Sequence, residues 1–221
     1  RNTKSPHRQS TGASPAPTYA ACVALGSPAE GATVFAYIDE SIAYDAMASQ
    51  RIYTLVAVLV PYEVIDHARH HMVTLRPRGA KKLHWHAASP ELRLQIAETL
   101  TELEVFPVLC QRAQPQGESE ERGRRICLKR SLSILGRSGV SLATAESRGP
   151  AQDRRDIALV KHLRSSRWLE SRLTLMHAPG PSEPLLWLAD AVCGASTARF
   201  AGHDDYFDLL ARRMQLEVHH L

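Results

Sequence analysis

The amino-acid sequence predicts an α/β domain built on a mixed β-sheet flanked by helices. Two observations lead to this prediction. The runs 32–39 and 51–60 are rich in β-branched and aromatic residues and are separated by a polar loop, which indicates a hairpin of two buried strands. Segments with strand character then alternate with helical segments along the rest of the 221 residues, as is typical of a sheet with helices packed on it.

The first half of the chain contains two helix signals. Pro61 begins a predicted helix over 61–75, and the loop 76–82 that follows it is basic. Ser89-Pro90 predicts a helix start, because serine accepts a hydrogen bond from the first turn and proline fits the first helical position. The apolar residues on one face of this helix are Leu92, Ile96, Leu100 and Leu103. A third strand is predicted over 105–110.

Helices and strands alternate in the second half of the chain. The predicted elements are a helix over 118–137, a strand over 139–145, a helix over 152–169, a strand over 171–177, a helix over 183–200 with Ser182 as its N-cap, and an amphipathic segment over 204–218. Three strands followed by helix, strand, helix, strand and helix is the chain order of ribonuclease H-like domains. In such a fold the helices after the second strand form an insertion.

The predicted domain is preceded by a segment of different composition. Residues 1–30 are rich in Ser, Pro, Thr, Gly and Ala and lack periodicity, which predicts a disordered tail ahead of a single domain over 31–221. The chain begins with Arg1 and not with Met, as expected of a fragment or a processed product.

Composition excludes several classes of protein. No apolar stretch approaches the roughly 18 residues that span a bilayer, and no secretory pattern is present, so we expect no membrane partner. The four cysteines are scattered without paired spacing, which favours a reducing cytoplasm over a disulfide framework or a Cys-based zinc site. A formal net charge of +4 is compatible with a polyanionic partner. The sequence is also compatible with a homo-oligomer.

Three acidic residues are placed where a buried carboxylate needs a partner. Asp39 ends the first predicted strand, directly before Glu40, and an unpaired ionised carboxylate is costly to bury there. Glu146 ends the fourth predicted strand. Asp190 interrupts a helix that is apolar nearly all round and must therefore be buried. We expect Asp39, Glu146 and Asp190 to meet at one edge of the sheet.

Three convergent carboxylates predict a metal site. Mg²⁺ and Mn²⁺ prefer hard oxygen ligands, and two such ions can activate water and stabilise the leaving oxygen of a phosphodiester. Strand neighbours point to opposite faces, so we assign Asp39 to the metal and Glu40 to a supporting position. The alternative is that the acids cap helices or pair with nearby arginines, for which Arg148, Arg199 and Arg51 are candidates.

Histidines form a second group of candidates. His84 and His86 would share one face of a strand and could ligate a transition metal; alternatively, they are exposed around a buried Trp85. His67 and His71 have the i,i+4 spacing of a metal pair, but the HExxH glutamate is missing, which favours a solvated helix face. His177 is a further, weaker candidate near the same edge of the sheet.

Two groups of basic residues could neutralise phosphates. The loop group is Arg76, Arg78, Lys81 and Lys82, and the helix group is Arg122, Arg124, Arg125, Lys129 and Arg130. Glu118, Glu120 and Glu121 lie just before or among the helix group, so ion pairs on a helix surface explain it equally well. The loop group has no such compensation and is the better candidate.

The motifs resemble those of one known family. Asp39-Glu40-Ser41 after a hydrophobic strand and Leu188-Ala189-Asp190 in a late helix are similar to the opening and late motifs of the DUF3800 proteins. That family is regarded as ribonuclease H-like with metal-dependent nuclease chemistry, and the resemblance covers about residues 32–200. Ile42 stands where the family usually has Gly, and Glu146 where it commonly has Asp.

The resemblance also implies roles for other residues. The family often has an acid or a histidine near Lys82–His86, which implies that His84 is a proton shuttle or a substrate contact. For a further acid on the first core helix, the candidates are Glu118, Glu120 and Glu121.

The sequence therefore predicts a metal-dependent nuclease that hydrolyses the phosphodiester bonds of RNA or DNA. Asp39, Glu146 and Asp190 would hold two Mg²⁺ or Mn²⁺ ions, and Glu40 and His84 would support them. The alternatives are a catalytically degenerate binding or interaction module on the same fold, and a metalloenzyme that uses His84 and His86.

Overall fold

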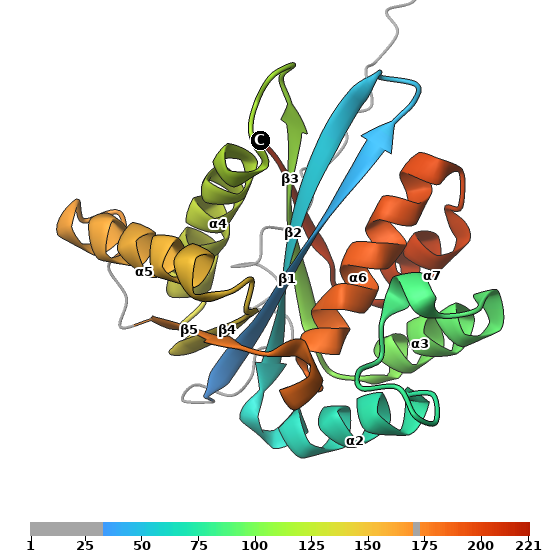
Figure 1. Ribbon diagram of the computed structural model, residues 1–221. Helices are drawn as coiled ribbons and strands as arrows, with labels where there is room; N and C mark the ends of the chain where they lie inside the picture. Colours follow the sequence, from blue (N-terminus) through green and yellow to red (C-terminus); the bar gives the residue numbers. More distant parts are fainter. Residues whose placement is uncertain (1–32, 170–172) are drawn as a thin grey trace, which may run out of the picture.

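A six-stranded mixed sheet forms the centre of the computed structural model, which describes residues 33–169 and 173–221 (Figure 1). The strands lie in the order β5-β4-β1-β2-β3-β6. They are β1 (Val34–Asp45), β2 (Gln50–Pro61), β3 (Phe106–Gln114), β4 (Leu142–Glu146), β5 (Thr174–Ala178) and β6 (Glu217–His220). β2 is antiparallel to its neighbours β1 and β3, and the other neighbouring pairs are parallel. The predicted α/β class with a mixed sheet is confirmed.

Helices cover both faces of this sheet (Figure 1). One face carries α4 (Glu120–Arg137) and α5 (Pro150–Ser165). The other face carries α2 (Ile65–Leu75), α3 (Pro90–Glu102), α6 (Leu186–Ala198) and α7 (Asp205–Arg213). The short 3₁₀ turns are η1 (Tyr62–Val64), η2 (Trp85–Ala87), η3 (Gly180–Ser182) and η4 (Arg199–Ala201). Among the described helices, none is both long and apolar enough to span a bilayer.

The apolar run of β2 supplies both cores. Successive strand residues point to opposite faces, so Val56 and Val58 pack in the core beneath α6, while Leu55 and Leu59 pack in the core beneath α4. A strand that is buried on both faces has no polar alternation, which explains the unbroken hydrophobic sequence of β2.

The first strand is longer than predicted. The expectation that Asp39 ends this strand is wrong, because β1 continues to Asp45 and stays paired with β2 down to Gln50. Its pairing with β4, in contrast, ends where Ile38 meets Ala145. Asp39 is therefore the point at which β1 loses one of its two neighbours.

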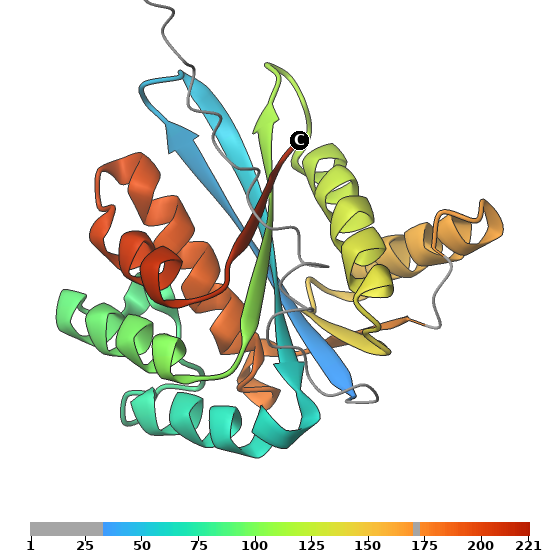
Figure 2. The same ribbon diagram turned by 180° about the vertical axis from the view of Figure 1, so that it is seen from behind.

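Most of the other predicted elements are present with shifted ends. Ser89 caps α3 through its side chain, as expected. Ser182 does not cap α6; its hydroxyl donates to the carbonyl of Pro179, and Leu185 precedes the helix. The closing segment 204–218 forms α7 and contributes to the unpredicted β6, which pairs with β3 at the sheet edge (Figure 2). The predicted tail 1–30 lies outside the described residues.

Trp85 anchors the segment between α2 and α3 against α6. Its side chain is 1% exposed, and Gly194 of α6 leaves the space that it fills. A Cβ atom at Gly194 would lie 2.1 Å from Cδ1 of Trp85, far inside van der Waals contact. The position of the tryptophan thus depends on a helix residue without a side chain.

This packing predicts that Gly194→Ala destabilises the protein. Alanine favours a helix over glycine by about 1 kcal/mol, but overpacking a core costs about 1–3 kcal/mol, so we expect a net loss of stability. Denaturant unfolding of the variant tests this. In a Trp85→Leu background the cost of Gly194→Ala should disappear, and an equal cost in both backgrounds would contradict the contact.

Candidate functional site

The three predicted acids line one pocket of about 280 Å³. Ile38 pairs with Ala145, so the next residue on each strand, Asp39 on β1 and Glu146 on β4, projects at the same edge of the sheet. Helix α6 packs against β1 and contributes Asp190 to the same pocket. The chain therefore brings together three carboxylates that are separated by more than 40 residues in sequence.

The Asp190 carboxylate ties α6 to the segment before α3. Its Oδ2 accepts a hydrogen bond of 2.7 Å from the backbone N–H of Trp85, and its Oδ1 lies 2.9 Å from Nδ1 of His84. The hydrogen bond to Asp190 raises the pKa of His84 above its ordinary value, against the opposing effect of partial burial. A lone acid inside an apolar helix is tolerated because both of its oxygens have partners.

Glu146 is held by a lysine. Nζ of Lys82 lies 2.8 Å from one carboxylate oxygen of Glu146 and 3.1 Å from the other. Burial alone would lower the pKa of Lys82, but its hydrogen bond to Glu146 and the nearby charges of Asp190 and Asp39 raise it. On the other side, a Cβ at Gly180 would lie 2.3 Å from Oε1 of Glu146, so the glycine leaves the room that this carboxylate needs.

Asp39 is the least compensated of the three acids. Its Oδ1 accepts a 2.8 Å hydrogen bond from the backbone N–H of Glu40, and no group in the described part of the chain donates to its Oδ2. Burial and then the charges of Asp190 and Glu146 raise the pKa of Asp39 well above its usual range, which Lys82 and His84 offset only in part. A further cation in the pocket would therefore stabilise the ionised form of Asp39.

Glu40 faces the opposite side of the sheet, as expected for the strand neighbour of Asp39. It forms ion pairs with Arg124 and with Nε of Arg148, the latter at 3.4 Å. Arg124 also donates to Asp156 at 2.6 and 3.2 Å, and Nε2 of His177 lies 3.1 Å from the same carboxylate. These five side chains form a charge network beneath α4 and α5, which we call the Glu40 network.

The Glu40 network changes the interpretation of two predicted features. Arg124, assigned to a basic helix surface, is only 2% exposed and is occupied by Glu40 and Asp156. His177 belongs to this network and is not among the residues that line the pocket. The pocket thus has an acidic side, formed by Asp39, Glu146 and Asp190, and a second side whose acid is already paired.

The alternative partners proposed for the acids pair elsewhere. Arg51 lies 3.5 Å from Glu120, and Arg199 lies 3.5 Å from Asp204. Arg148 forms ion pairs with Glu40, Glu121 and Asp156. Within residues 33–169 and 173–221, no arginine forms an ion pair with the three acids of the pocket.

The predicted acid from the first core helix is not in the pocket lining. Glu118 is paired with Arg112 at 2.8 Å and with Arg122, and neither Glu120 nor Glu121 lines the pocket. Helix α4 contributes Arg124 to the pocket instead.

The histidine predictions have separate outcomes. His84 and His86 both line the pocket, with ring centroids 5.7 Å apart, but residues 85–87 form a 3₁₀ turn and not the strand that would align the two side chains. His67 and His71 lie on α2 with their Nε2 atoms 2.9 Å apart, outside this pocket.

Lys82 lies inside the pocket and contacts Glu146, a position that its prediction as part of a basic loop does not include. The sequence does carry a signal for it, because Leu83 and Trp85 alternate with Lys82 and His84. Two buried apolar residues in alternation with polar ones indicate that Lys82 and His84 project to the same side.

The donor set was tested against a divalent cation. Over the described residues, no group of three or more His, Cys, Asp or Glu side chains is arranged to hold a metal ion. The donors themselves are carboxylate oxygens, the type that Mg²⁺ and Mn²⁺ prefer, and Oδ2 of Asp39 is without a donor in the described structure. The donor atoms are chemically suited to such an ion. In this structure the carboxylates of Glu146 and Asp190 are placed to contact Lys82 and His84.

Comparisons of the chain with protein-family models, with curated proteins and with solved structures give no match.

We predict that Asp39→Asn stabilises the metal-free protein at neutral pH. A carboxyl group whose pKa is raised on folding loses stability as pH rises from the unfolded pKa through the folded one, and asparagine removes this loss. Thermal unfolding in EDTA should show a higher melting temperature, with about 2–4 °C for each kcal/mol gained. Asp66→Asn, at a fully exposed carboxylate, is the control. An unchanged or lower melting temperature for Asp39→Asn would contradict the raised pKa of Asp39.

Asp156 gives the opposite prediction. Burial alone would raise its pKa, but hydrogen bonds from His177 and Arg124 and the charges of Arg124 and Arg148 lower it to about 2. The stability that it contributes is present above the unfolded pKa of 3.8 and is lost as pH falls toward 2.

Replacing Asp156 with Asn should therefore cost about 3 kcal/mol at neutral pH, the lower end for breaking a buried ion pair. Denaturant unfolding at pH 7 and pH 3 checks this, and the difference from the parent protein should shrink at pH 3. The same difference at both pH values would show that the charge of Asp156 is not the cause.

Proposed function

We propose that the protein is a metal-dependent nuclease that hydrolyses phosphodiester bonds in the pocket lined by Asp39, Glu146 and Asp190. The observation that supports this most is the convergence of three carboxylates, from β1, β4 and α6, on one pocket in which no side-chain cation of the described residues forms an ion pair with Asp39. The chain order β1-β2-β3-α4-β4-α5-β5-α6 also supports the ribonuclease H-like assignment, with α2 and α3 as the insertion. The resemblance to DUF3800 motifs points the same way.

In this proposal Asp39, Glu146 and Asp190 hold Mg²⁺ or Mn²⁺. Such an ion, when bound, polarises a phosphate oxygen and lowers the pKa of water, the two effects that phosphodiester hydrolysis needs. The role of the chain is to fix the carboxylates: the Trp85 N–H and His84 orient Asp190, and Gly180 leaves space for Glu146.

His84 is placed to move a proton. Its Nδ1 is bound to Asp190, and its side chain is 40% exposed on the pocket, so Nε2 is the atom left for the substrate. The raised pKa keeps the imidazole protonated closer to neutral pH, as a general acid at the leaving oxygen requires. Glu40 supports the site from the other face through Arg124.

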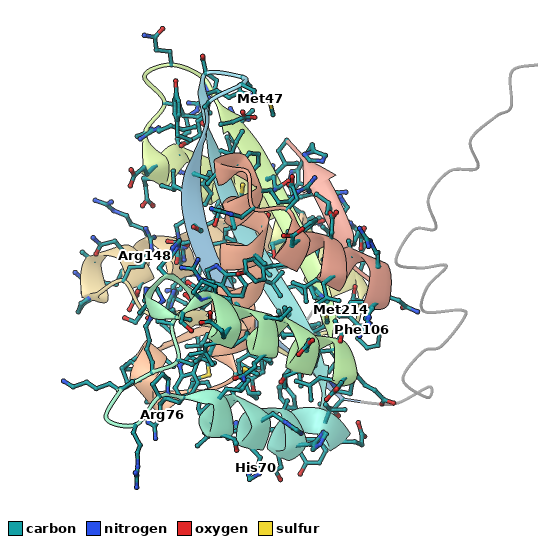
Figure 3. All side chains as sticks on the ribbon, turned by 90° about the vertical axis from the view of Figure 1, so that its right-hand side faces the viewer. Met47, His70, Arg76, Phe106, Arg148 and Met214 are labelled. Carbon is teal, nitrogen blue, oxygen red and sulfur yellow. The ribbon has the colours of Figure 1, made fainter. Side chains whose placement is uncertain are left out.

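The loop before Lys82 favours a polyanionic substrate over a small phosphate ester. Arg76, Arg78 and Lys81 are exposed, and none of the described acids forms an ion pair with them. Arg76 lies just after α2 (Figure 3), where its guanidinium group donates to the carbonyl of Lys81 at 3.5 Å and lies 5.9 Å from the centroid of the Trp187 ring. Because Lys82 ends this loop inside the pocket, a phosphate backbone bound along the loop would lead to the three acids.

A second candidate function is nucleic acid binding without cleavage. It is favoured by the contacts of Lys82 and His84, which already neutralise part of the charge on Glu146 and Asp190. It is also favoured by α4, which contributes Arg124 to the pocket and no acid.

Cleavage assays distinguish the two functions. Labelled single-stranded and duplex RNA and DNA would be incubated with Mg²⁺, Mn²⁺ or EDTA. We expect metal-dependent cleavage, and a loss of at least about 100-fold in Asp39→Asn, Glu146→Gln and Asp190→Asn, since even residues that only support metal ligands are worth 10–100-fold.

Asp204→Asn is the matched control, because this carboxylate is 60% exposed and its ion pair is with Arg199, outside the pocket. Asp39→Asn is the decisive variant, since its expected gain in stability excludes unfolding as the cause of lost activity. Binding of nucleic acid with no cleavage under any metal condition would contradict the nuclease and support the binding module.

A further inference from the structure

We infer that the pocket takes one divalent cation, and that the ammonium group of Lys82 occupies the place of a second. This inference rests on the proposed function and specifies the metal content of the same site. It departs from the two-ion arrangement that the sequence predicts.

The charges of the pocket favour a single ion. Asp39, Glu146 and Asp190 bring three negative charges to the acidic side of the pocket, and Lys82 brings one positive charge in direct contact with Glu146. His84 adds a second positive charge beside Asp190 when its imidazole is protonated. At most two negative charges then remain, and one divalent ion is enough to neutralise them. Two divalent ions beside Lys82 would instead leave the pocket with excess positive charge before any substrate is bound.

The second argument is that Lys82 is fixed in place. Leu83 and Trp85, one and three residues after it, are 2% and 1% exposed, so the backbone that follows the lysine is anchored in the core. Asp190 binds the N–H of Trp85 and adds a further restraint on this segment. Nζ of Lys82 contacts both oxygens of Glu146, at 2.8 and 3.1 Å, and the side chain is 25% exposed. Lys82 thus differs from the exposed Lys81 beside it.

The third argument is a shortage of ligands for a second ion. Of the four acids that line the pocket, Glu40 faces the other side of the sheet and is paired with Arg124 and Arg148. Glu146 is engaged by Lys82 through both oxygens. Asp190 is likewise engaged, through Oδ2 by the N–H of Trp85 and through Oδ1 by His84, so the carboxylate oxygen most available to a metal is Oδ2 of Asp39. Asp39, with the remaining lone pairs of Asp190 and Glu146, suffices for one cation that keeps several waters.

The test counts bound Mn²⁺ per chain by equilibrium dialysis and by isothermal titration calorimetry on the full chain. We expect one Mn²⁺ in the parent protein, one in Lys81→Met and two in Lys82→Met, because removal of the ammonium group frees both oxygens of Glu146. Methionine keeps the length of the lysine stem, and Lys81→Met is the matched control for loss of a positive charge from the same loop.

Two Mn²⁺ ions in the parent protein would overturn the inference and leave the proposed function intact. A count of one in a folded Lys82→Met would also overturn it, and circular dichroism establishes the folding of this variant. If Lys82→Met does not fold, the count in the parent protein and in Lys82→Gln decides. No bound Mn²⁺ in the parent protein would contradict the proposed function itself.

Discussion

The buried carboxylate of Asp190 is the contact on which the rest of the site depends. It is the only acid in α6, and it binds the backbone of Trp85 and the ring of His84 across a chain separation of more than 100 residues. This contact fixes the segment that carries Lys82, and Lys82 in turn positions Glu146. Leaving the buried N–H of Trp85 without its acceptor costs about 1–3 kcal/mol, so Asp190 affects both the fold and the geometry of the pocket.

The end of the β1–β4 pairing divides the charges of the pocket into two groups. Asp39 and Glu40 point to opposite faces because β1 remains an extended strand through both residues. On one face Asp39 lies near Glu146 and Asp190, and Lys82 and His84 compensate its charge only in part. On the other face Glu40 belongs to the Glu40 network, which contains Arg124 and Arg148. Met47 marks the tip of the β1–β2 hairpin and Arg148 lies well below it in Figure 3, so the Glu40 network, to which Arg148 belongs, is away from this tip.

The sequence predicts the three acids because each is a charged residue in or at the end of an apolar run. Asp39 and Glu146 end predicted apolar strands, and Asp190 interrupts an apolar helix, so all three are recognisable without tertiary information. Lys82 and the buried Arg124 are not recognisable in this way, since their partners lie 64 and 84 residues away in sequence and a basic loop or helix surface has the same composition. The four-residue β6 was missed because a strand this short, formed at the edge of the sheet, shows no clear alternation.

We propose that Asp39, Glu146 and Asp190 form one cation-binding centre. Anomalous diffraction from crystals grown with Mn²⁺ tests this most directly, because the signal locates the ion independently of any activity. We expect one anomalous peak in the pocket, about 2 Å from carboxylate oxygens of Asp39 and Asp190, the distance expected for a small divalent ion. An empty pocket at saturating Mn²⁺, or a peak bound only by residues outside it, would contradict the proposed centre.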